Sequence, residues 1–255
     1  MWYYEEDNTC PVITAERHAA SSHGFREGAF RLLETAVVFD MSGFERVSGD
    51  YETACISGRF PRFLDGCPIY RIRKNGKEIC ALHGGWGAPM AADTVETLRA
   101  LGVKNVISAG MIGGFSPEVQ TGDLLVPPFA LCEEGTSRHY AAEPQRAEPD
   151  EVLRQGLLTF VKGCRSLPIV TTDAVYRQTY YKEALWRSRG AVGVDMETSA
   201  IFTVSRCLGM RAAALLMVSD VHPVEEGAPA WRWEITPDMR KRAICGAIDF
   251  ALTLE

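Results

Sequence analysis

Short apolar segments alternate with segments of helical periodicity along most of this 255-residue chain. Strands are predicted where short apolar stretches lie between turn residues, at 36–39, 68–72, 79–82, 105–109, 123–126 and 212–218. Helices are predicted at 92–101, at 196–208 and after Pro237, and a hairpin turn at Gly76. Strands that alternate with helices predict an α/β fold with helices on both sides of the sheet, in a single domain over residues 1–255.

Composition excludes several classes of protein. Lys plus Arg number 27 against 33 for Asp plus Glu, so nucleic acid is not an expected partner. The longest apolar stretch of the C-terminal half, 212–218, falls far short of the roughly 20 residues of a membrane span. The first seven residues are acidic and aromatic, unlike a signal peptide. The eight cysteines contain no Cys-x-x-Cys pair, which favours reduced, mostly buried thiols in a cytoplasmic protein.

Three predicted strand exits carry unusual residues: 84–89 (Gly-Gly-Trp-Gly-Ala-Pro), 110–114 (Gly-Met-Ile-Gly-Gly) and 219–222 (Ser-Asp-Val-His). In α/β sheets, ligands bind at the carboxyl ends of strands. Glycine-rich exits let backbone N–H groups approach an anion or a sugar, although glycine also serves simply to make a tight turn. Neither glycine segment matches the dinucleotide fingerprint or the phosphate-binding loop.

Acidic residues near these exits are candidates for chemistry. For Asp195 we prefer the role of a helix cap. Glu197 lies in an otherwise apolar predicted helix face, where a carboxylate needs hydroxyl partners such as those of a ribose. Asp220 follows a buried strand and is either a turn cap or a catalytic acid. The five histidines show no metal-ligand spacing, so no metal site is expected, and no Gly-x-Ser-x-Gly motif is present.

A series of segments along the chain follows the order found in one enzyme family. They are Gly85–Ala92, Ala100–Ile107 leading into Gly110–Gly114, Gly122–Pro127, Glu134–Tyr140, Thr172–Ala174, Val194–Ala200 and Val218–Asp220. This series resembles the nucleoside phosphorylase family, which includes uridine phosphorylase, hexamer-type purine nucleoside phosphorylase and methylthioadenosine nucleosidase. The resemblance covers about residues 35 to 252 and leaves the first 34 unexplained. It implies a three-layer α/β/α fold with a mixed central sheet.

The resemblance also implies cleavage of the N-glycosidic bond of a nucleoside, with no metal or organic cofactor. By position, Met196 and Glu197 would bind the ribose, while Ser219, Asp220 and Gly113 would contact the base. Asp220 would be the catalytic acid that protonates a purine nitrogen as the bond breaks. An acid beside the base and an acceptor beside the sugar both act on charge that develops in the transition state.

The phosphate-binding region departs from the family pattern. The early Gly-Asp-Pro turn is replaced by 39–43 (Phe-Asp-Met-Ser-Gly), and Ser108 and Met111 stand where family phosphorylases have an arginine and a hydroxyl residue. Gly85, Gly110, Arg62 and Arg71 are the other candidates for this region. A phosphate dianion without a guanidinium partner is poorly held, so the choice between phosphate and water as the nucleophile stays open.

We predict phosphorolysis, with inorganic phosphate as co-substrate, because most members of the family are phosphorylases. A hydrolytic nucleosidase is the alternative. The Arg177-Gln178 pair leaves a pyrimidine base as a further alternative, and a catalytically silent nucleoside-binding protein is another. The family also implies a homo-oligomer (dimer, trimer or hexamer) that functions in nucleoside metabolism, with purine salvage as the expected role.

Overall fold

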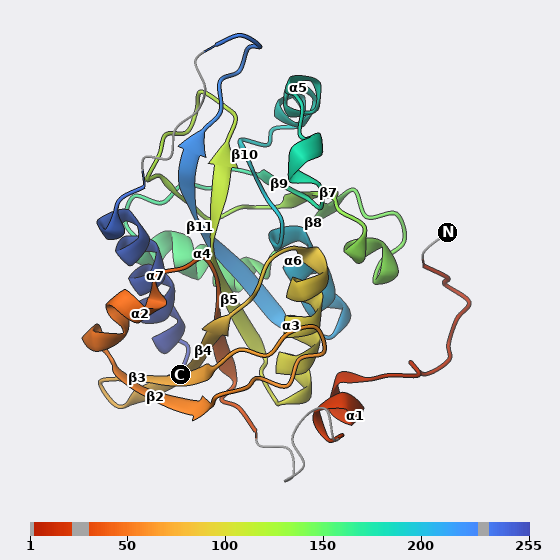
Figure 1. The fold of residues 1–255 in the computed structure, drawn as a ribbon, viewed down its shortest axis with the longest axis vertical. Coiled ribbons are helices and arrows are strands. Elements are labelled where there is room, and N and C mark those ends of the chain that lie inside the picture. The colour runs from red at the N-terminus through yellow and green to blue at the C-terminus, as the bar shows by residue number, and fades with distance from the viewer. Residues whose placement is uncertain (1–2, 22–30, 229–234) are drawn as a thin grey trace.

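The computed structural model describes residues 3–21, 31–228 and 235–255, and within these ranges the backbone forms one eleven-stranded mixed sheet (Figure 1). The strands are β1 (Thr35–Asp40), β2 (Glu52–Ser57), β3 (Ile69–Lys74), β4 (Lys77–His83), β5 (Asn105–Gly114), β6 (Leu124–Leu125), β7 (Ala130–Glu133), β8 (Arg146–Ala147), β9 (Ile169–Thr172), β10 (Gly193–Asp195) and β11 (Arg211–Val221). Their order is β2-β3-β4-β1-β5-β10-β9-β7-β8, and β11 pairs with β5 and β6.

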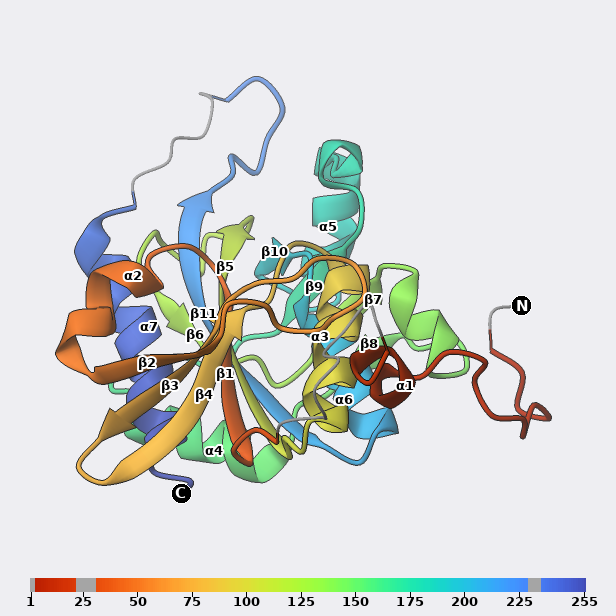
Figure 2. The same cartoon turned by 60° about the horizontal axis from the view of Figure 1, so that its bottom comes forward.

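Helices cover both faces of the sheet (Figures 1 and 2). On one face α3 (Ala88–Ala100) packs against α6 (Thr198–Cys207), and the short α1 (Ala15–Ala19) packs on α3. On the other face α7 (Pro237–Leu252) contacts β11, β5, β1 and β4, with α2 (Phe44–Val47) and α4 (Glu151–Phe160) beside it. The remaining α-helix of the described segments, α5 (Tyr180–Ser188), stands beyond the ends of β9 and β10 (Figure 1). The expected three-layer α/β/α architecture with a mixed sheet is confirmed.

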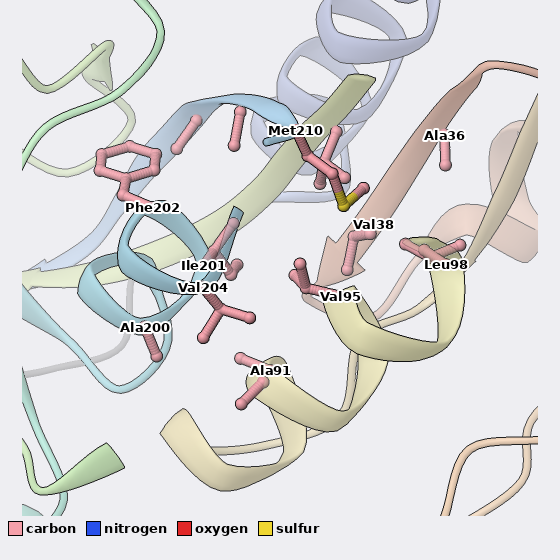
Figure 3. Packing of buried hydrophobic residues seen from close by; sticks show 14 of the residues in the cluster. Ala36, Val38, Ala91, Val95, Leu98, Ala200, Ile201, Phe202, Val204 and Met210 are labelled. Atoms are coloured by element: carbon pink, nitrogen blue, oxygen red, sulfur yellow. The ribbon is translucent and has the colours of Figure 1, made fainter. Parts of the chain in front are cut away.

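The packing between α3 and α6 explains why the apolar pattern of the sequence predicted these elements correctly. Val95 and Leu98, on one face of α3, point with Ile201 and Val204 of α6 into the space beside Val38 of β1 (Figure 3). All five side chains are buried. Apolar residues at helical spacing and the all-apolar strand therefore bury their surfaces against each other, which is the main stabilising contribution to such layers.

The predicted elements are present, with shifted ends. The hairpin at Gly76 joins β3 to β4. The first predicted helix begins at Ala88 rather than 92, because Pro89 fits its first turn. The second begins at Thr198 rather than Met196, and the last strand continues past 218 to Val221.

The expectation that most cysteines are buried is wrong. Cys67 and Cys80 are buried, whereas Cys10, Cys55 and Cys207 are exposed; all eight are free thiols. The cysteines occupy exposed and half-buried positions without a regular spacing, so the sequence pattern does not indicate which of them are buried. None of the helices in the described segments is both long and apolar enough to cross a membrane.

Candidate active site

The site begins where two strands meet end to end beside β5. β1 runs parallel to β5 and ends at Asp40, which pairs with Gly110. β10 runs antiparallel to β5, from Gly193 opposite Gly114, and ends at Asp195. The two strands approach each other along the same edge of β5, so their terminal carboxylates are brought together. This topology concentrates negative charge at the centre of the sheet.

A cavity of about 210 Å³ opens at this point. Side chains from β1, β5, β10, β11 and the segments around η3 (Val175–Arg177) line it. The lining residues are Asp40, Trp86, Met111, Gly113, Thr172, Val175, Gln178, Val194, Asp195, Met196, Glu197, Ser219, Asp220 and His222. They include four carboxylates and one imidazole, and among the described residues no Lys or Arg joins them.

Asp40 is the most isolated of these carboxylates. Its Oδ2 accepts a hydrogen bond from Ser108 Oγ at 2.8 Å, while the buried Oδ1 has no hydrogen-bond partner within the described part of the chain. Gly84 makes room for it, because a Cβ there would lie 2.0 Å from Oδ1. Burial, together with the charge of Asp195, raises the pKa of Asp40 well above its ordinary value. A carboxyl with such a pKa is able to accept a proton near neutral pH.

Asp195 and Glu197 form the opposite wall. Thr171 Oγ1 donates to Asp195 Oδ1 at 2.6 Å, and the backbone N–H of Thr198 donates to Oδ2 at 3.1 Å. The capping role preferred for Asp195 is therefore confirmed, although this residue also lines the cavity. Burial raises the pKa of Asp195, and these hydrogen bonds oppose the shift.

Glu197 precedes the helix instead of lying on its face, so the expected helical placement is wrong. It is the N-cap residue of α6 and its backbone turns away from helical geometry there. Its Oε1 accepts the backbone N–H of Gly87 at 2.7 Å, and Oε2 accepts that of Met196 at 3.2 Å. Burial, then the charges of Asp40 and Asp195, raises its pKa. The carboxylate is thereby fixed in orientation while its charge is disfavoured.

Asp220 reaches the cavity through a bulge in β11. The register with β5 shifts between Val218 and Asp220, so Ser219 is an extra residue in the strand. The Ser219 hydroxyl lies within hydrogen-bond distance of the Ile112 carbonyl oxygen (3.0 Å) and of Asp220 Oδ1. Asp220 Oδ2 lies 3.1 Å from His222 Nε2. A carboxyl group and an imidazole are thus in contact on this side of the site.

The structure brings the predicted ribose and base residues together: Met196, Glu197, Gly113, Ser219 and Asp220 all line the cavity, as does Met111. Several other residues predicted for the site do not line the cavity. Gly85 and Gly110 lie outside the lining, and Ser108 acts only through Asp40.

The two candidate arginines do not line the cavity of this chain. Arg62 is buried, and its Nη1 donates to the carbonyl oxygens of His83 (3.0 Å) and Gly84 (2.6 Å) and to Thr94 Oγ1 (2.8 Å). Arg71 projects from the exposed face of β3, 3.8 Å from Glu78. Arg71 is exposed on β3, and the carbonyls at the β4–α3 turn satisfy the buried guanidinium of Arg62.

The site residues predicted from the sequence did not include Asp40; Gln178 entered only through the pyrimidine alternative, and His222 only as part of the strand exit 219–222. Asp40 follows an apolar strand in the same way as Asp220, and that placement was an available signal. Within residues 3–21, 31–228 and 235–255, no group of three or more His, Cys, Asp or Glu side chains is arranged to hold a metal ion.

A family model described as Phosphorylase superfamily matches residues 34–246. The chain belongs to the phosphorylase superfamily. Guanosine phosphorylase from Halorubrum lacusprofundi is 30% identical over 181 residues, which cover 63% of this chain and 73% of that relative. Uridine phosphorylase from Haemophilus influenzae is 27% identical over 157 residues, 54% of this chain and 62% of that relative.

The fold of this superfamily chain also matches a solved structure. Purine nucleoside phosphorylase from Toxoplasma gondii, in complex with immucillin-H, superposes with a TM-score of 0.77 at 19% identity, covering 93% of this chain and 96% of that one. The expected family and its fold class are therefore confirmed. The chain is an enzyme of the nucleoside phosphorylase family.

Proposed function

We propose that this protein cleaves the N-glycosidic bond of a purine-type nucleoside and that water, rather than phosphate, attacks the sugar. The observation that carries the proposal is Asp40. This buried carboxylate, one oxygen of which has no hydrogen-bond partner among the described residues, lines the cavity in a region where the family resemblance predicts phosphate contacts. A phosphate dianion beside it would meet negative charge and, among the described lining residues, no Lys or Arg.

Water suits the same surroundings. An attacking water must lose a proton, and Asp40, with its raised pKa, accepts one as the oxygen bonds to the anomeric carbon. Negative charge around the sugar also stabilises the cationic character that the sugar gains as the base leaves. The products are the free base and the free pentose.

The remaining cavity residues have distinct roles in this proposal. Glu197, fixed by the N–H groups of Gly87 and Met196, accepts hydrogen bonds from the ribose hydroxyls, with Met196 packed against the sugar. Asp220 delivers the proton that the departing purine needs, with Ser219 and Gly113 beside the base. The pyrimidine alternative has less support, because the Gln178 amide already donates to Glu183 at 2.7 Å and Arg177 lies outside the cavity lining.

Phosphorolysis is the second candidate, and the names of the relatives favour it. Two relatives similar to this chain are named guanosine phosphorylase and uridine phosphorylase, and both names state phosphorolysis. For this chain, phosphorolysis requires cations from outside the described lining, such as an arginine of a second copy in a homo-oligomer. The cytoplasmic location and the role in purine salvage belong to the same proposal.

A nucleoside panel assayed with and without phosphate tests the proposal. Hydrolysis predicts free base and free pentose at the same rate in phosphate-free buffer. Strict phosphate dependence with a pentose 1-phosphate product would overturn the assignment of water. Binding of nucleosides without any base release would instead identify a catalytically silent nucleoside-binding protein, and sedimentation of the same sample measures the oligomeric state.

A further inference from the structure

His222 lines the cavity and lies between two carboxylates from different elements. Its Nε2 is 3.1 Å from Asp220 Oδ2 on β11, and its Nδ1 is 3.0 Å from Glu183 Oε1 on α5. Glu183 is buried, and 39 residues separate it from His222 in sequence. The imidazole therefore links the candidate acid to a helix outside the central layers.

The charges around this imidazole favour its protonated form. Asp220 and Glu183 face it from β11 and α5, and Gln178 Nε2 lies 3.1 Å from Nδ1. β5 presents Gly113 to the ring. Arg187 lies behind Glu183, 3.8 Å from Oε2. Burial by itself lowers the pKa of His222, but hydrogen bonds and charge from Asp220 and Glu183 raise it to about 9.

Gly113 leaves the space that this arrangement needs. A Cβ at position 113 would lie 2.9 Å from His222 Nε2 and 3.7 Å from Asp220 Oδ2. Any side chain there would push the imidazole away from the aspartate. The glycine, the bulge at Ser219 and the buried Glu183 together hold the Asp220–His222 contact at one geometry.

We propose that His222 is a positioning residue that orients Asp220 and restores the proton which Asp220 passes to the leaving base. The inference rests on the proposed function. The proton on Nε2 moves to the Asp220 carboxylate at Oδ2, and Asp220 passes one proton on to the purine nitrogen, so the carboxylate is regenerated. His222 then becomes a neutral imidazole that still donates Nδ1–H to Glu183. Solvent returns the proton after the products leave, so no other reactant is consumed.

The first experiment follows the His222 ring by ¹⁵N-edited NMR, with its signal assigned by its loss in His222→Gln. We expect the wild-type ring to titrate near pH 9 and to shift toward the ordinary value of about 6.5 in Glu183→Gln. Titration of the wild-type ring near 6.5 would overturn the inference. This readout does not depend on activity.

The second experiment compares two leaving groups across pH. His222→Gln should lower kcat for a purine nucleoside on the order of 100-fold and leave KM nearly unchanged. For a nitrophenyl riboside, whose aglycone leaves without a proton, the loss should be only a few-fold. The wild-type profile should fall as pH rises through about 9, and His222→Gln should lack that limb.

His139→Gln is the matched control, because His139 lines a separate hollow between α1 and α3. It should retain wild-type rates on both substrates. Equal losses on both substrates in His222→Gln would show that His222 only maintains the fold, and would overturn the inference. A wild-type enzyme that releases no base from any nucleoside would contradict the proposed function itself, whereas a low ring pKa contradicts the role of His222 alone.

Discussion

Two aspartates end strands on opposite sides of β5, and their surroundings differ in charge. Asp40 ends β1 opposite Gly110, and Asp220 lies near the end of β11 opposite Gly113. Asp40 has one hydroxyl donor, an unpartnered oxygen and other carboxylates nearby. Asp220 has a hydroxyl donor and an imidazole that Glu183 holds from behind.

The comparison shows how one residue type is prepared for opposite tasks. Burial and the charge of Asp195 disfavour the charged form of Asp40, and they outweigh the opposing effects of the Ser108 hydroxyl and the Arg62 charge, which makes the Asp40 carboxylate a better base. A neighbouring imidazolium gives Asp220 a source of protons, which suits a group that must act as an acid. Pairs of carboxyls in contrasting surroundings commonly divide acid and base roles in this way. The predictions below test that division, starting from the largest expected effect.

Asp220→Asn should lower kcat for a purine nucleoside by about 100- to 10,000-fold, the usual contribution of a general acid. Because a nitrophenyl aglycone leaves without protonation, its release should be much less affected. Steady-state rates on the two substrates provide the measurement. If both substrates lose the same factor, Asp220 supports the fold or the sugar, and the purine assignment loses its main support.

Asp40→Asn should lower the phosphate-free release of base by about 100-fold, because the amide cannot accept a proton from water. Asp50→Asn is the matched control, since Asp50 pairs with Lys241 at 2.8 Å on the surface. Its rate should equal that of the wild type. Unchanged hydrolysis in Asp40→Asn would mean that another group activates water. Asp40 would then not be the base, and the proposed division of roles between the two aspartates would fail.

Glu197→Gln should weaken recognition of the ribose hydroxyls by about 0.5–1.5 kcal/mol, the range for an ordinary hydrogen bond, because burial and nearby carboxylates disfavour the charge of this group. A 2′,3′-dideoxy substrate should then show little additional loss in the variant, which kcat/KM for both substrates would reveal. Glu96→Gln is a control for a half-buried carboxyl on α3. If wild type and Glu197→Gln lose equally on the dideoxy substrate, Glu197 is structural.

Asp40→Asn should also stabilise the protein at pH 8, because the folded state disfavours the ionised carboxyl. The folded state raises the pKa of Asp40 to about 7 from an ordinary value near 3.9. A raised carboxyl pKa contributes stability below the unfolded value, and that stability is lost as pH rises through the folded value.

Thermal unfolding at pH 4 and pH 8 tests this sign. The gain in Tm for Asp40→Asn should appear at pH 8 and vanish at pH 4, while Asp50→Asn should show no such dependence on pH. A gain in Tm of the same size at both pH values would show that the ionisation of Asp40 is not the cause of the stabilisation.

The order of strands and helices was available in the sequence, because apolar periodicity is local. Val95 and Leu98 lie on one face of α3 as their spacing predicts, and the run before Ser219 is the buried strand β11. The family order of segments identified Met196, Glu197, Ser219 and Asp220, and all four line the cavity. What a residue does locally, such as capping by Asp195, was equally predictable.

Only the tertiary structure decided which partners the charged side chains have and how burial changes their proton affinity. Arg62 was a candidate for the phosphate region, yet its guanidinium donates hydrogen bonds to the carbonyl oxygens of His83 and Gly84. Asp40 and Asp195 are 155 positions apart, and they meet because β1 and β10 run toward each other along β5. The proton affinity of a side chain depends on burial and on neighbours that folding brings from distant segments. The sequence therefore determined which acids are available, and the packing of β1, β10, β11 and α5 decided their burial and partners, on which the proposed acid and base roles rest.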